Sequence, residues 1–149
     1  MTLTEQERKV YGNRCPEGYE KMKLLGKGGC ALVWLGKSKG SEELVAMKQF
    51  PKSADSKSVS DIETSKTERI INKTLFNDDG TPRSEIEEHP GVKYISALVD
   101  SKENNFDMWL VYQLGGQSLT RNLYDVKGEF YKGERLYNCL LYTSDAADE

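Results

Sequence analysis

The most informative part of this sequence for its fold is a glycine-rich run, Leu25-Gly26-Lys27-Gly28-Gly29-Cys30-Ala31-Leu32-Val33. It lies between two segments whose apolar patterns predict β-strands, Tyr19–Leu25 and Ala31–Lys37. Glycine lets a backbone approach a ligand with no side chain in the way, and successive N–H groups in such a turn can hold phosphate oxygens. Taken alone, however, the run is also typical of an ordinary hairpin turn.

The next predicted strand, Glu43–Phe50, adds a second element of a phosphate site. Within it, Ala46 and Lys48 share one face because strand side chains alternate. A small alanine leaves room for a flat ring, and the lysine ammonium can reach phosphates. The alternative is a lysine in solvent, which is the usual environment of this residue. A strand rather than a helix follows the glycine run, and no Gly-Lys-Ser/Thr closes it, which disfavours dinucleotide-binding and P-loop folds.

The rest of the chain predicts one helix and two more strands. Residues 1–18 are polar and predict a loose leader, while Ser60-Asp61-Ile62-Glu63 has the form of a capping box for a helix that ends near Leu75. Two strands then follow, Val92–Leu98 and Met108–Gln113, with a polar turn at Ser101–Asn105 between them. The order predicts an α+β fold with a five-stranded antiparallel sheet and one main helix.

This order of features resembles the ATP-binding N-terminal lobe of protein kinases, with its Gly-rich loop and Val-Ala-x-Lys strand. The resemblance implies that a helix glutamate pairs with Lys48. Glu68 is preferred because it shares a helical face with Ile71 and Leu75, whereas its rival Glu63 fits the capping box. His89-Pro90-Gly91-Val92 is similar to the corner that leads kinases into their fourth strand, which indicates a structural role for this histidine.

Further along, Met108 to Leu119 resembles the fifth strand and hinge of a kinase, with Tyr112 as gatekeeper. The resemblance implies that Lys48 and Glu68 are the catalytic residues present, and that no metal ligand lies in this chain. The residues implied to contact ATP are Leu25, Gly26, Lys27, Gly28, Gly29, Cys30, Ala31, Val33, Ala46, Lys48, Tyr112, Gln113 and Gly115.

The chain also departs from the kinase pattern. Ala31 replaces the third loop glycine, Cys30 stands at the loop tip, and Phe76–Glu88 reads as a surface insertion. No H-R-D-x-x-x-x-N or D-F-G motif is present, so we expect a partial kinase domain over 19–138 that includes the first helical part of the C-lobe. Residues 139–149 resemble translated sequencing-adapter DNA and are expected to be a non-native tail; a genuine short tail is the alternative.

The implied function is transfer of the ATP γ-phosphoryl to serine or threonine of a protein substrate, with Mg²⁺ ligands expected in the missing C-lobe and the fragment itself inactive. A pseudokinase or nucleotide-binding regulatory module, and a non-enzymatic α+β interaction domain, are the alternatives. With 21 basic and 24 acidic residues among 149, the charge gives no case for nucleic-acid binding. Three scattered cysteines, no signal peptide and no membrane span predict an intracellular protein, cytoplasmic or nuclear.

Overall fold

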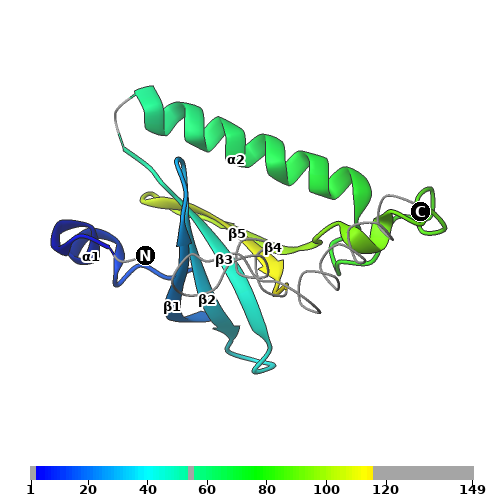
Figure 1. Ribbon diagram of the computed structural model, residues 1–149, viewed down its shortest axis with the longest axis horizontal. Helices are drawn as coiled ribbons and strands as arrows, with labels where there is room; N and C mark the ends of the chain where they lie inside the picture. Colours follow the sequence, from blue (N-terminus) through cyan, green and yellow to red (C-terminus); the bar gives the residue numbers. More distant parts are fainter. Residues whose placement is uncertain (1–2, 54–55, 116–149) are drawn as a thin grey trace, which may run out of the picture.

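The computed structural model of the chain describes residues 3–53 and 56–115, which form an α+β fold with an open five-stranded antiparallel sheet (Figure 1). The strands lie in the order β1-β2-β3-β5-β4, so β1 and β4 are the edges. The elements are α1 (Glu5–Tyr11), β1 (Tyr19–Lys27), β2 (Leu32–Ser38), β3 (Leu44–Pro51), α2 (Ser56–Leu75), a short 3-10 helix (Val92–Tyr94), β4 (Leu98–Glu103) and β5 (Asp107–Gln113).

The predicted α+β class and antiparallel five-stranded sheet are confirmed, and α2 is the one long helix of the described residues. The expected start of a C-lobe, up to residue 138, and the tail at 139–149 lie outside the described residues. The predicted insertion Phe76–Glu88 lies at the surface in large part, but its first residue, Phe76, is buried and pairs with Pro82.

Three predicted boundaries are wrong. The leader is not uniformly loose, because Thr4 and Glu7 form a capping box that starts α1. Ser60 is not a helix cap: α2 begins at Ser56, and the Ser60 carbonyl accepts a hydrogen bond from Thr64 inside the helix. The fourth strand is not the apolar segment 92–98 but the more polar β4, which also takes up the start of the predicted turn at 101–105.

The sheet buries a different apolar cluster on each face. One face packs against residues of the N-terminal segment and the other lies under α2. The first cluster is Leu32, Trp34, Val45, Met47, Trp109 and Val111, and the second is Ala31, Phe50, Leu98, Met108 and Leu110. The alternation along β3 sends Ala46, Lys48 and Phe50 toward the α2 side, as strand geometry requires.

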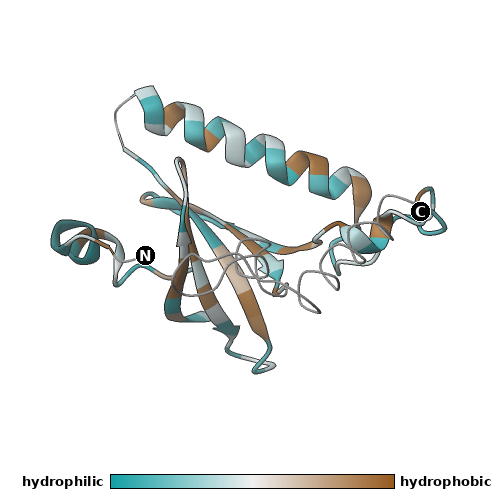
Figure 2. Cartoon of the chain, in the orientation of Figure 1, coloured by the Kyte–Doolittle hydropathy of each residue, from teal (hydrophilic) through white to brown (hydrophobic). Residues whose placement is uncertain are grey.

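The helix α2 crosses one side of the sheet, yet it buries polar residues rather than an apolar stripe (Figures 1 and 2). Its buried residues are Ser58, Ser65 and Asn72, which recur every seven positions and so share one face. Ile70 and Ile71 are exposed. Among the described residues, no helix has the length and apolar character needed to cross a bilayer.

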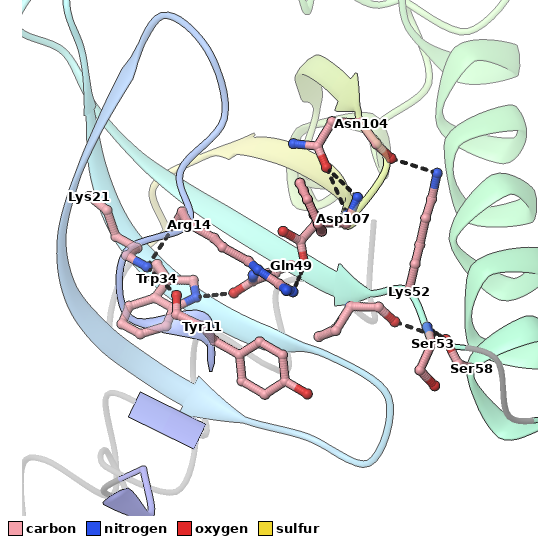
Figure 3. A network of polar contacts seen from close by, with 12 residues as sticks. Tyr11, Arg14, Lys21, Trp34, Gln49, Lys52, Ser53, Ser58, Asn104 and Asp107 are labelled. Atoms are coloured by element: carbon pink, nitrogen blue, oxygen red, sulfur yellow. Dashed lines mark hydrogen bonds and ion pairs between the residues drawn. The ribbon is translucent and has the colours of Figure 1, made fainter. Parts of the chain in front are cut away.

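A buried polar network attaches the N-terminal segment to the opposite face of the sheet (Figure 3). The Arg14 guanidinium lies 3.3 Å from the Asp107 carboxylate, whose side chain is only 1% exposed. Gln49 donates to the same carboxylate oxygen at 3.0 Å and accepts from the Trp34 indole at 2.9 Å. Lys21 donates to the carbonyls of Tyr11 and Arg14, so the segment before β1 is fixed at several points.

Candidate functional site

The register of the sheet gathers the predicted site residues from three strands on the α2 side. Val33 of β2 pairs with Lys48 of β3, and Ala46 of β3 pairs with Tyr112 of β5. Directly paired residues of antiparallel strands point to the same face, and Ala46 and Lys48 are two residues apart. The four side chains therefore form one patch under the middle of α2.

At the centre of this patch, Lys48 forms an ion pair with Glu68 of α2. The ammonium donates to both carboxylate oxygens, at 2.9 and 3.2 Å, and the two side chains are about equally exposed, at 29% and 31%. The structure thus brings Glu68, rather than Glu63, to the strand lysine. Glu63 is exposed and lies 3.7 Å from Lys66 on the same helix. Its predicted role in a capping box is wrong, because α2 begins at Ser56 and Glu63 lies in its interior.

Tyr112 is the third member of this cluster. Its hydroxyl donates a hydrogen bond to Glu68, so that one carboxylate joins β3, β5 and α2. Burial raises the pKa of Tyr112, and the hydrogen bond to the Glu68 carboxylate raises it further. The phenol therefore remains a proton donor over the physiological pH range.

A hollow of about 920 Å³ opens beside this cluster, and its size suits a nucleotide-sized ligand. The strands contribute Val33, Ala46, Lys48 and Tyr112 to its lining, and the far end is lined by Ile71, Leu75 and Ile95. The helical face shared by Glu68, Ile71 and Leu75 does face inward, but it faces this open hollow rather than the packed core. Ile71 is 57% exposed.

The predicted hinge residues lie at the edge of the same hollow. Gln113 and Gly115 both line it, and the Gln113 N–H donates to the Ala97 carbonyl at 3.4 Å. Leu25 is 44% exposed at the end of β1 and does not line the hollow. Its predicted contact with adenine therefore stays a prediction.

The glycine-rich loop lies outside this hollow and lines a smaller one of about 230 Å³. At the hairpin turn, the Gly28 N–H donates to the Ala31 carbonyl at 2.9 Å. Lys57 in the first turn of α2 donates to the Gly29 carbonyl at 2.8 Å, and Lys27 pairs with Glu7 of α1. Two further loop positions predicted to contact ATP line the smaller hollow, the half-buried Cys30 and the buried Ala31. Gly26 lines neither hollow.

The fold itself does not explain the glycines at positions 26 and 29. A Cβ atom added at either would meet no described atom within 4 Å, and neither residue has a positive φ. Positive φ angles occur instead at Gly18 and Gly80, in turns away from the loop. The open space above the loop backbone is what a ligand approaching its N–H groups would need.

The contact between α1 and the loop affects an acidic group. The hydrogen bond from Lys27, followed by those from Thr4, lowers the pKa of Glu7 to about 2. Glu7 therefore stays ionised at neutral pH, although the pair lies at the surface and is open to screening by salt.

Sequence reasoning missed Tyr112 as a partner of Glu68, and it missed Glu7 and Lys57 as contacts of the loop. The Thr4-x-x-Glu7 pattern was a usable signal for α1, because it is itself a capping box. The other two contacts join residues 44 and 28 positions apart, and no local pattern marks them.

Comparison with known proteins assigns the chain to no family. No family model matches the sequence, and a search of curated proteins finds no match.

Proposed function

We propose that the described residues are the ATP-binding lobe of a protein kinase directed at protein serine or threonine. The observation that carries the proposal is the Lys48–Glu68 ion pair, which lies beside a hollow of nucleotide size. The pair joins the third strand of an antiparallel sheet to the long helix that follows it. This arrangement is what the resemblance to kinases implies for the N-terminal lobe.

Each part of the site then has a role toward ATP. Val33 and Ala46 would contact the adenine ring, and the backbone of Gln113 and Gly115 would pair with its edge. Lys48 would neutralise charge on the α and β phosphates, while Glu68 keeps its ammonium directed into the hollow. The backbone of the glycine-rich loop would cover the phosphates.

Metal binding is not assigned to described side chains. Within residues 3–53 and 56–115, no three or more His, Cys, Asp and Glu side chains gather where they could hold an ion. Mg²⁺ bound to ATP would supply neutralisation of phosphate charge. The chain contains neither an H-R-D nor a D-F-G motif, and we therefore propose nucleotide binding, not phosphoryl transfer, as the activity of these 149 residues.

Protection of Lys48 from acylation tests this proposal. The chain is treated with an amine-acylating reagent with and without Mg·ATP, and modified lysines are quantified by mass spectrometry. At an ATP concentration ~10 times its Kd, about one site in ten remains unoccupied. The rate of Lys48 labelling should therefore fall about 10-fold. Lys23, exposed on β1, is the control and should label equally in both samples. Equal labelling of Lys48 at saturating ATP would refute the proposal.

A nucleotide-binding regulatory module without transfer activity is the second candidate, and the same protection would be seen. The two differ in whether sequence downstream of these 149 residues carries the aspartates of the H-R-D and D-F-G motifs. A purely non-enzymatic interaction domain predicts no protection at all.

A further inference from the structure

The helix α2 is held on the sheet mainly by polar anchors: besides Lys57, which donates to the Gly29 carbonyl, three of them lie along its length. In its first turn, Ser58 donates to the Pro51 carbonyl at 3.0 Å. Near its end, the Asn72 amide donates to the Ser96 carbonyl at 2.9 Å and accepts from the Leu98 N–H at 2.8 Å. Between these two, Glu68 is the central anchor, with Ile62 the apolar residue of α2 that packs on the core cluster.

The two partners that hold Glu68 differ in stiffness. Tyr112 is half-buried and its ring packs against the core cluster of Ala31, Phe50, Leu98, Met108 and Leu110, which fixes the position of its hydroxyl. Lys48 reaches the carboxylate through a flexible four-carbon chain. A ring with two rotatable bonds loses less freedom on forming its contact than a lysine does. The phenol is therefore the more rigid of the two donors.

We infer that Tyr112 is a positioning residue, whose hydroxyl keeps Glu68 and the middle of α2 against the sheet when a bound phosphate shares the Lys48 ammonium. This inference rests on the proposed function for the phosphate, while the contact between Tyr112 and Glu68 stands on the structure alone. With Tyr112 in place, the carboxylate retains a second donor whatever Lys48 contacts. Without the hydroxyl, Lys48 is the remaining link from the sheet to Glu68 among the described residues, and phosphate and helix compete for it.

The substitution Tyr112→Phe removes the hydroxyl and keeps the ring that packs on the core. In the full 149-residue chain, amide hydrogen exchange over residues 62–72 should become roughly 5-fold faster, the change expected from losing one hydrogen bond to a charged, half-exposed acceptor. The affinity for Mg·ATP should weaken by about the same factor. Without the Tyr112 hydroxyl, a phosphate that binds Lys48 weakens the contact that holds α2 on the sheet, and this cost is subtracted from the binding free energy. In a Glu68→Ala background, adding Tyr112→Phe should change neither quantity further.

A matched control comes from the opposite face of the sheet. Tyr19 likewise donates its hydroxyl to a carboxylate, that of Asp100, at 2.8 Å, and it lines neither of the two hollows. The substitution Tyr19→Phe should leave exchange in α2 and the affinity for ATP unchanged.

The outcomes separate the two proposals. Unchanged exchange over 62–72 in Tyr112→Phe, or an equal further effect of this substitution in the Glu68→Ala background, would overturn the role given to Tyr112. If the unsubstituted chain fails to bind Mg·ATP, the proposed function falls, and the exchange measurements alone still decide whether Tyr112 positions Glu68 and α2. An effect confined to ATP affinity, with exchange unaltered, would also overturn the inference, because it would place the hydroxyl on the ligand instead.

Discussion

Substitution of Asn72 should detach the C-terminal end of α2 from the sheet. The side chain is buried, with 8% exposure, and makes two hydrogen bonds of 2.9 and 2.8 Å to the backbone at the start of β4. In Asn72→Ala, the N–H of buried Leu98 loses its acceptor, which costs about 1–3 kcal/mol. Ser96 is exposed, so its carbonyl can accept a hydrogen bond from water instead. Loss of the hydrogen bond from Asn72 to this carbonyl therefore adds only about 0.5–1 kcal/mol.

The free energy of unfolding should therefore fall by about 2–4 kcal/mol in Asn72→Ala. Urea unfolding followed by tryptophan fluorescence measures it, since Trp34 and Trp109 are buried in the sheet. Asn77→Ala is the matched control: Asn77 is exposed and its amide donates to Thr81 and Pro82 within the same turn, so its loss should cost less than about 1 kcal/mol. A loss in Asn72→Ala that is no larger than in the control would refute the view that polar anchors hold α2.

Four further predictions concern the N-terminal segment and the glycine-rich loop. Arg14→Ala leaves the buried Asp107 carboxylate without its cation, and the free energy of unfolding in urea titrations should fall by about 2–3 kcal/mol. This is less than the loss expected for a fully buried ion pair, because the Arg14 side chain is 27% exposed. An unchanged urea midpoint would contradict the prediction. Burial raises the pKa of Asp107 above 3.8, so the folded state binds the proton more tightly, and its contribution to stability should rise as pH falls through the folded pKa; Asp107→Asn should abolish this part of the pH dependence. The pKa of Glu7 in the folded state is lowered to about 2, so the stabilisation from its pair with Lys27 is present above about pH 4.5 and is lost as the pH falls toward 2. In Lys27→Met, NMR titration should find the Glu7 pKa shifted back toward 4.5, and an unmoved pKa would rule the pair out. Gly26→Ala should change the free energy of unfolding by less than about 0.5 kcal/mol while weakening ATP binding, and a loss of stability with unaltered ATP affinity would show that the glycine serves the fold.

Local periodicity predicts four of the five strands and the orientation of the key residues in them. The alternation in β3 predicted that Ala46 and Lys48 share a face, and they do. Helical spacing placed Glu68 on the side of α2 that faces the sheet, where it meets Lys48. Both patterns work because the side-chain direction of a regular element follows from backbone geometry alone.

Hydrophobicity misplaced β4 because an edge strand has different requirements. The segment 92–98 is the more apolar, yet the strand is 98–103, whose charged residues are tolerated where one side of the strand faces solvent. What fixes β4 is its backbone pairing with β5, from Leu98↔Tyr112 to Glu103↔Met108. Backbone pairing leaves no mark in the hydrophobic pattern.

The start of α2 was misplaced for a related reason. Serine and threonine are typical of helix caps, but in α2 several of them bond to carbonyls of the same helix, as Thr64 does to Ser60 and Thr67 to Glu63. A capping-box pattern therefore occurs in the interior of the helix without acting as one. The contacts of Tyr112 with Glu68 and of Arg14 with Asp107 span 44 and 93 residues, and only the folded topology brings them together.

Nucleotide binding at Lys48 can be measured by calorimetric titration of the chain with Mg·ATP and with adenosine, before and after Lys48→Met. We predict that the unsubstituted chain binds both ligands, and that Lys48→Met weakens ATP by about 10-fold or more through loss of one charge-assisted contact to phosphate, while adenosine affinity is unchanged. Lys23→Met, at an exposed position on β1, should alter neither affinity. Absence of ATP binding to the unsubstituted chain, or equal ATP affinity in Lys48→Met, would contradict the proposal that this lobe is a kinase nucleotide site.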